Sequence, residues 1–207
     1  MSHSPQPTIR SFIAVELPPQ VHALLATVQE ELRESMGRAA NAVKWVRPEG
    51  THLTLQFLGN VPANSIGQIE QALRDAAAAA SPFTLEVAGL GAFPNPRRPR
   101  VIWVGLTGDR HSMAALRSLY ESVAGRMKTL GFRPDKSFNP HLTLGRIRET
   151  ARRDELESIS NALQYPEGQP TFATTFDVTG VSLMRSDLNP GGAVYTQLAH
   201  VQFETAA

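Results

Sequence analysis

The tetrapeptide HLTL occurs twice in the chain, beginning at His52 and at His141. In each copy a histidine and a threonine stand two positions apart, with leucines between and after them. Side chains alternate along a β-strand, so His52 and Thr54 would share one face while the leucines anchor the other face in the core. The second copy repeats this with His141 and Thr143. We therefore expect each strand to present one imidazole and one hydroxyl on the same side.

Two imidazoles that face one substrate suit a displacement at phosphorus, in which the nucleophile and the leaving oxygen lie in line on opposite sides. A neutral histidine takes a proton from the attacking water, and a protonated histidine gives one to the departing oxygen. Threonine hydroxyls donate to the non-bridging oxygens, whose negative charge grows in the transition state. The motifs therefore predict acid–base catalysis at a phosphate, with Thr54 and Thr143 as phosphate-binding residues.

The residues that follow the two motifs differ, since one copy continues HLTLGR and the other HLTLQF. Arg146 supplies the positive charge that a phosphate needs, and Phe57, at the same place in the first copy, does not. Strict alternation would put Arg146 on the leucine side, but Gly145 permits a bulge or a strand end that redirects it. We predict that Arg146 binds phosphate and that Phe57 packs in the core.

The two motifs lie in matching series of elements, each with a strand, a helix, the HLTL strand, a second helix and a final strand. The first series occupies residues 10–18, 21–37, 52–55, 65–80 and 85–90, and the second occupies residues 100–108, 112–131, 141–144, 152–164 and 176–181. Each first strand begins with arginine, and each first helix closes on glycine. The offset is about ninety residues, which indicates an internal duplication.

This duplication predicts an α+β fold with two pseudo-symmetric lobes, whose antiparallel sheets meet at a central cleft with helices outside. We expect one domain over residues 1–207, with repeat units at about 10–94 and 100–186 and a last strand at about 194–203. The proline-rich, basic segment 93–100 would form an exposed loop between the units. A pseudo-two-fold axis would bring the two HLTL strands face to face across the cleft.

Composition excludes several kinds of site and favours a soluble protein. The 207 residues include no cysteine, which excludes disulfides, thiolate catalysis and cysteine-ligated zinc. Neither motif carries an acidic residue or a third histidine at ligand spacing, so we expect no metal and no cofactor. The net charge of +1 means that an anionic ligand needs a local cluster of cations. The chain shows no signal peptide and no membrane span, which predicts a cytoplasmic protein. We also expect a monomer, because a chain with two lobes completes its site without a partner.

Other residues have simpler interpretations. A histidine on a strand is often structural, and we expect surface or packing roles for the remaining four, His3, His22, His111 and His200. Three rings are candidates for stacking on a base or for lining the cleft, namely Trp45, Phe138 and Tyr195. Arg97, Arg98 and Arg100 would either contact a nucleic-acid backbone or remain solvated in the loop. Arg10 and Arg100 begin equivalent strands, so these two also have a structural interpretation.

The paired HLTL motifs resemble those of the two-histidine (2H) phosphoesterases. The flanking segments RSFIAVELP, WVRPEGTHLTLQFLG, RVIWVGL, NPHLTLGR and VSLMRSDL resemble the RNA 2′,3′-cyclic phosphodiesterase branch, also called bacterial and archaeal 2′-5′ RNA ligases. The resemblance implies a metal-independent enzyme that opens a terminal 2′,3′-cyclic phosphate on RNA and leaves a 2′-phosphate. It also implies the reverse reaction, in which RNA ends are joined through a 2′-5′ linkage without ATP.

The resemblance also implies a role for each residue of the motifs. His52 would protonate the leaving oxygen and His141 would activate water, although the symmetry of the motifs is compatible with either direction. Thr54, Thr143 and Arg146 would bind the phosphate. Two other functions stay open: a phosphodiesterase of small cyclic or 2′,5′-linked nucleotides, and an RNA-end binder without catalysis. The expected partners are therefore RNA ends or small nucleotides that carry a cyclic phosphate.

Overall fold

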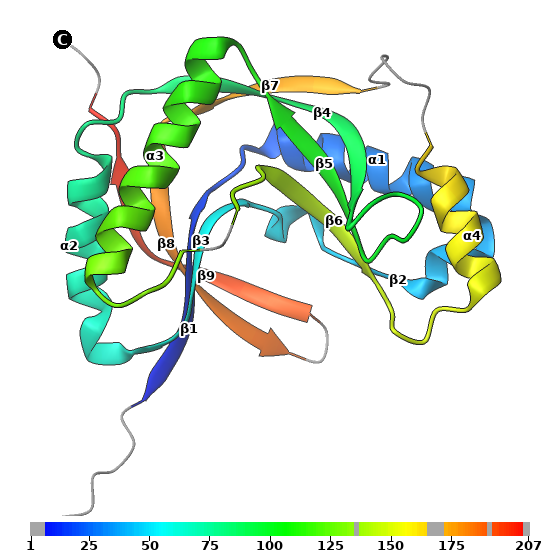
Figure 1. Cartoon of the computed structure of the whole chain (residues 1–207), viewed down its shortest axis with the longest axis horizontal. Coiled ribbons are helices and arrows are strands. Elements are labelled where there is room, and N and C mark those ends of the chain that lie inside the picture. The colour runs from blue at the N-terminus through cyan, green and yellow to red at the C-terminus, as the bar shows by residue number, and fades with distance from the viewer. Residues whose placement is uncertain (1–6, 135–136, 165–171, 190–191, 205–207) are drawn as a thin grey trace, which may run out of the picture.

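The computed structural model of the chain describes residues 7–134, 137–164, 172–189 and 192–204 (Figure 1). Its strands form two antiparallel sheets. Sheet A has the order β3 (Leu53–Pro62), β1 (Thr8–Val15), β8 (Gly180–Asn189), β9 (Gly192–Gln202). Sheet B has the order β2 (Val43–Trp45), β6 (His141–Ile147), β5 (Val101–Thr107), β4 (Phe83–Phe93), β7 (Ala173–Val178).

Four helices lie outside the sheets: α1 (Pro19–Met36), α2 (Ile66–Ala77), α3 (Arg110–Thr129) and α4 (Arg153–Ala162). Helices α2 and α3 pack on each other and contact sheet A, whereas α1 and α4 lie together beside sheet B (Figure 1). This arrangement confirms the predicted α+β class, with antiparallel sheets inside and helices outside. Within the described residues, no helix is long and apolar enough to cross a membrane.

The ends of the first helix in each half follow from local chemistry. Helix α1 closes at Gly37, whose φ of 55° lies in the left-handed region that glycine adopts without a steric penalty. Helix α3 begins after Asp109, whose carboxylate accepts a hydrogen bond from the Ser112 backbone N–H at 2.7 Å. Both helices lie where the apolar periodicity of the sequence predicts them.

The two halves of the chain are interleaved rather than separate. Strand β4, from the first half, pairs with β5 and β7 of the second half, and β8, from the second half, pairs with β1. Each sheet therefore contains strands from both halves. One cluster of buried apolar side chains includes Ile13 and Leu53 from sheet A together with Ile102 and Leu142 from sheet B. The halves share one hydrophobic core as a result.

Candidate active site

The two HLTL strands have the same pattern of exposure. Their four leucines, Leu53, Leu55, Leu142 and Leu144, are buried, and each leucine contributes on the order of 1.5–3 kcal/mol by leaving water. Thr54 and Thr143 are half-buried on the other face. The leucines thus fix the orientation of each strand, and the alternation that the sequence predicts is confirmed for both threonines.

A bulge follows each threonine. Along β1, Ala14 pairs with Thr54, and Ile13, the residue before Ala14, pairs with Gln56, so that Leu55 is an extra residue. In the pairing of β5 with β6, the same shift leaves Leu144, between Thr143 and Gly145, without a partner residue on β5. The predicted bulge before Arg146 is therefore present, and Arg146 is exposed.

The prediction that Phe57 packs in the core is wrong, because 53% of its surface is exposed. The bulge at Leu55 is the physical reason, since it changes the alternation after Thr54 and turns Gln56 inward in place of Phe57. The Phe57 ring lies 6.0 Å from the ring of Phe12, measured between centroids. It therefore extends the aromatic surface beside the first motif.

His52 lies just before β3, with its imidazole held between two rings. The ring stacks on Phe12 at 4.4 Å and meets the edge of Tyr195 at 4.9 Å, measured between centroids. Its Nδ1 is 3.0 Å from the Gly50 carbonyl oxygen. Burial lowers the pKa of His52 from 6.5 to about 4, against smaller opposing effects of the Gly50 hydrogen bond and of the Glu16 charge. His52 is therefore neutral at pH 7 in the free chain.

His141 begins β6 and has matching surroundings. Its Nδ1 is 2.7 Å from the carbonyl oxygen of Asn139, two residues earlier, just as His52 contacts Gly50. Its ring meets Phe93 edge-on at 4.9 Å and lies 6.3 Å from Trp103, measured between centroids. A carbonyl oxygen only accepts, so Nδ1–H donates in both histidines. In the neutral form, each Nε2 then keeps its lone pair for a substrate.

Charge and contact link the two motifs. Strands β3 and β6 belong to different sheets but contact each other in the middle of the molecule (Figure 1). Burial raises the pKa of Tyr195, whereas the positive charges of Arg146 and Arg10 act to lower it. Arg146 from the second motif therefore lies within electrostatic reach of the phenol that contacts His52 of the first motif.

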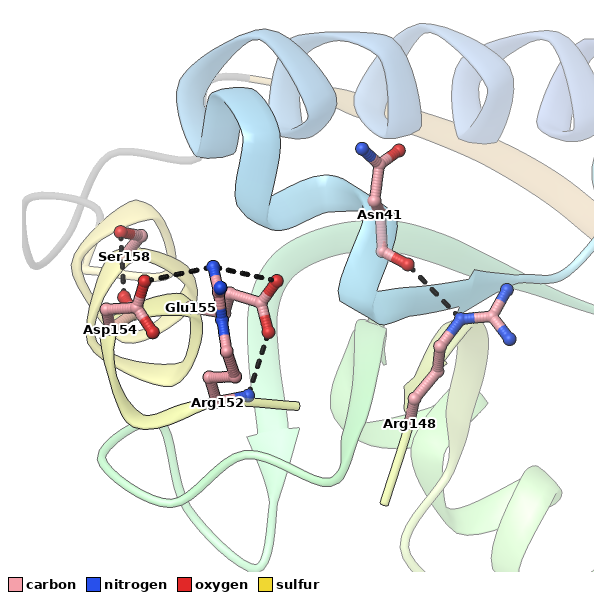
Figure 2. A network of polar contacts seen from close by, with 6 residues as sticks. All are labelled: Asn41, Arg148, Arg152, Asp154, Glu155 and Ser158. Carbon is pink, nitrogen blue, oxygen red and sulfur yellow. Dashed lines mark hydrogen bonds and ion pairs between the residues drawn. The ribbon is translucent and has the colours of Figure 1, made fainter. Parts of the chain in front are cut away.

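Arg146 differs from the arginines near it in the sequence. Figure 2 shows Arg148, whose Nε donates to the Asn41 carbonyl oxygen at 3.2 Å, and Arg152, which contacts Asp154 and Glu155. By contrast, no carboxylate within the described ranges lies close enough to form an ion pair with Arg146. Its guanidinium is available to an anionic ligand.

Sequence reasoning missed Gln29, a buried polar side chain of α1 with only 1% of its surface exposed. Its Nε2 donates to the carbonyl oxygens of Val46, at 2.7 Å, and Leu144, at 3.0 Å. The Leu144 carbonyl also accepts from the Val46 N–H at 2.9 Å. Because Leu144 is the bulged residue, Gln29 holds the backbone from which Arg146 projects. A glutamine in the apolar stripe of a predicted helix was the one available signal.

Replacing Gln29 with leucine is expected to lower the free energy of unfolding by about 1–3 kcal/mol, because two buried carbonyl oxygens lose a donor. Urea denaturation followed by circular dichroism measures this change. The matched control is Gln71→Leu, since the Gln71 amide is exposed and donates only to Asp75 on the same helix. Equal stability of Gln29→Leu and the wild type would contradict the role of Gln29.

The three candidate stacking rings have different environments. The indole N–H of Trp45 donates to the Ala40 carbonyl oxygen at 3.2 Å, and Phe138 stacks on Tyr120 at 4.2 Å between centroids. Both of these rings therefore have packing partners. Tyr195 adjoins His52, as described above.

Three of the other four histidines lie within the described residues. His3 is outside the described residues. His111 is exposed, and His22 is half-buried on α1. His200 on β9 lies 2.8 Å from the Ser182 hydroxyl, which also donates to Glu16. Over the ranges that the structure describes, no group of three or more histidine, aspartate or glutamate side chains is placed to hold a metal ion.

Comparisons with known proteins show the family and the fold to which the chain is similar. The model of a family described as LigT-like phosphoesterase matches two stretches of the chain, residues 15–103 and 108–195. A protein of Methanothermobacter thermautotrophicus named RNA 2′,3′-cyclic phosphodiesterase is 34% identical over 190 residues, which covers 92% of this chain and 96% of that protein. A protein of the same name from Thermotoga maritima is 31% identical and covers 95% of this chain and 96% of its own length.

Two solved structures have the same fold. The crystal structure of a Thermus thermophilus protein has a TM-score of 0.74 and 29% identity, and the match covers 96% of this chain and all of that one, 100%. The crystal structure of Escherichia coli LigT has a TM-score of 0.70 and 24% identity, with 96% of this chain and 99% of that chain covered. At that identity the LigT structure is evidence for the fold alone.

Proposed function

Because the chain belongs to the LigT-like phosphoesterase family, we propose that it hydrolyses the 2′,3′-cyclic phosphate at the end of an RNA strand to a 2′-phosphate. The name that its relatives carry, RNA 2′,3′-cyclic phosphodiesterase, supports this substrate. The observation that carries the proposal is the matched pair of imidazoles, each fixed through Nδ1–H on a carbonyl two residues earlier. Both Nε2 atoms are thereby left for proton transfer.

In the proposed reaction, His141 takes a proton from water as the water oxygen attacks phosphorus. His52 gives a proton to the 3′ oxygen as the bond from phosphorus to that oxygen breaks. Thr54 and Thr143 donate hydrogen bonds to the non-bridging oxygens, and Arg146 offsets their growing charge. These groups supply the acid, the base and the charge stabilisation from the protein itself, so the proposal needs neither a metal nor a cofactor.

The direction of proton transfer is tested with a leaving group that needs no proton. If His52 is the donor, a substrate with sulfur in place of the bridging 3′ oxygen restores turnover to His52→Ala, because a thiolate leaves unprotonated. His141→Ala stays inactive on the same substrate, since it lacks the base. Comparing the two variants on oxygen and sulfur substrates gives the result, and rescue of His141→Ala alone would reverse the assignment.

The pKa of His52 predicts the pH at which its imidazole titrates in the free chain. Burial lowers this pKa to about 4, so the ring gains a proton only as the pH falls through about 4. As the donor, His52 must therefore take up a proton before it reacts at pH 7. We expect the NMR resonances of the His52 ring to shift with a midpoint near pH 4, in a range where circular dichroism shows the chain folded. A midpoint near the ordinary histidine value of 6.5 would contradict the burial effect.

The same site favours ligation when a 5′-hydroxyl takes the place of water. The attacking oxygen then belongs to a second RNA strand, and the product is a 2′-5′ phosphodiester formed without ATP. Incubating a cyclic-phosphate strand with a 5′-hydroxyl strand tests both reactions at once, because the 2′-phosphate and the joined strand separate on a gel. If the wild type forms neither of these products, the RNA-end function is ruled out. Small cyclic nucleotides then become the substrates to test.

A further inference from the structure

Building on the proposed function, we propose that Arg10 and Tyr195 bind the phosphodiester that precedes the terminal nucleotide. The site then takes an RNA strand of at least two nucleotides in preference to a cyclic mononucleotide. This subsite lies on the face of sheet A that carries Phe12, next to His52.

The register of β1 places Arg10 on this face. Ser11 and Ile13 are buried on the side of the main core, whereas Phe12 and Ala14 belong to the separate cluster on the opposite face. Arg10 alternates with Ser11 and so shares the face of Phe12. Two residues along a strand span roughly 7 Å, so the backbone of Arg10 lies about that far from the backbone of Phe12, whose ring stacks on His52. Its side chain is exposed.

Tyr195 connects Arg10 to the catalytic motifs. Its ring meets Phe12 edge-on at 5.3 Å and His52 edge-on at 4.9 Å, measured between centroids. The charges of Arg10 and Arg146 both act on its phenol, as their effect on the pKa of Tyr195 indicates. The phenolic O–H can donate to an anionic oxygen. Two cations from different sheets therefore act on one hydroxyl.

Within the described residues, the acidic side chain that acts on His52 is Glu16, which is bound to Ser182 and Gln197. In the described part of the chain, neither Arg10 nor Arg146 has a carboxylate within ion-pair distance. Arg185, on a neighbouring strand of sheet A, is bound to Asp187 at 2.8 Å. A 2′,3′-cyclic phosphate is a diester with one negative charge, and Arg146 balances it. Arg10 is then left for a second anion, and in an RNA strand that anion is the preceding phosphodiester.

A test of this subsite uses three substrates with the same terminal cyclic phosphate. The first is an adenosine 2′,3′-cyclic phosphate with a free 5′-hydroxyl, the second is the dinucleotide, and the third is the dinucleotide with an uncharged methylphosphonate linkage. For the wild type, we expect kcat/KM to be about tenfold higher on the charged dinucleotide than on the other two, as one charge-assisted contact provides. Arg10→Gln should abolish this preference and leave kcat/KM on the mononucleotide unchanged.

Two controls separate the subsite from general effects. Arg117→Gln removes an exposed arginine of α3 that pairs with Glu121 on its own helix, and it should keep the preference. Tyr195→Phe, which keeps the ring and removes the hydroxyl, should reduce it. Arg10→Gln should also lower the slope of log kcat/KM against log salt by about 1 on the charged dinucleotide.

Either of two results would overturn the subsite while leaving the proposed function intact. One is equal wild-type kcat/KM on the charged and uncharged dinucleotides. The other is an equal loss on all three substrates in Arg10→Gln, which would mean that Arg10 supports the fold or the reacting phosphate. If the wild type hydrolyses none of the three substrates, the proposed function fails, and the subsite fails with it.

Discussion

Replacing either His52 or His141 with alanine lowers kcat on a cyclic-phosphate RNA end by roughly 10²–10⁴-fold, the contribution of one general acid or base. Each variant loses one proton transfer and keeps Arg146 and the two threonines that we propose bind the phosphate. Affinity for a non-reacting strand with a 2′-phosphate end should therefore change little. The double variant should be only slightly slower than the slower single variant, because the two histidines act in one concerted step.

Single-turnover kinetics with enzyme in excess measure this loss, since they separate chemistry from binding and product release. His111→Ala is the matched control, because its imidazole is exposed at the start of α3. Thermal unfolding of His52→Ala should be measured alongside, as its ring packs between Phe12 and Tyr195. A folded His52→Ala or His141→Ala variant with wild-type turnover would contradict acid–base catalysis by the pair.

Replacing Arg146 with glutamine lowers kcat/KM by roughly 10²–10³-fold, the range found when one preorganised donor to a developing negative charge is removed. The bulge at Leu144 and the Gln29 hydrogen bond hold the strand from which Arg146 projects. The positive charge is therefore in place before the substrate binds. Glutamine keeps a hydrogen-bond donor but loses the charge.

Arg148→Gln is the matched control for Arg146→Gln. It lies two residues further along the chain, and its guanidinium donates to the Asn41 carbonyl oxygen (Figure 2). Both variants are compared with the wild type on the same RNA end by kcat/KM at low salt. An equal loss in the two variants would show that Arg146 acts only through general electrostatic attraction.

Local sequence patterns predicted the HLTL strands and the first helix of each half well, because their signals are short-range. The strand predicted at residues 176–181 is wrong, since this segment holds the end of β7 and the start of β8, which belong to different sheets. The leucines of both motifs are buried, and the glycine before Arg146 lies at a bulge, as expected. The equivalent bulge at Leu55 was missed, since Gln56 stands where the second copy has glycine. Phe57 was placed in the core for that reason. A comparison of the two copies position by position would have suggested that Phe57 follows Arg146 outward.

Long-range contacts explain what the sequence alone did not reveal. Tyr195 reaches His52 because β9 joins β8, and β8 joins β1, across most of the length of the chain. Gln29 reaches the Leu144 carbonyl from a helix of the other half. The pairing of β8 with β1 underlies the first contact, and β6, which carries Leu144, pairs with β2 of the first half. No local periodicity reports which sheet a strand joins.

We propose that the two HLTL motifs carry out acid–base hydrolysis of an RNA 2′,3′-cyclic phosphate without a metal. The measurement that tests it most directly is hydrolysis of a short RNA with that end by the wild-type chain in excess EDTA, with the product end identified. The predicted result is full turnover and a 2′-phosphate product. Loss of turnover in EDTA, restored by adding a divalent cation, would contradict the claim and make the histidines metal ligands.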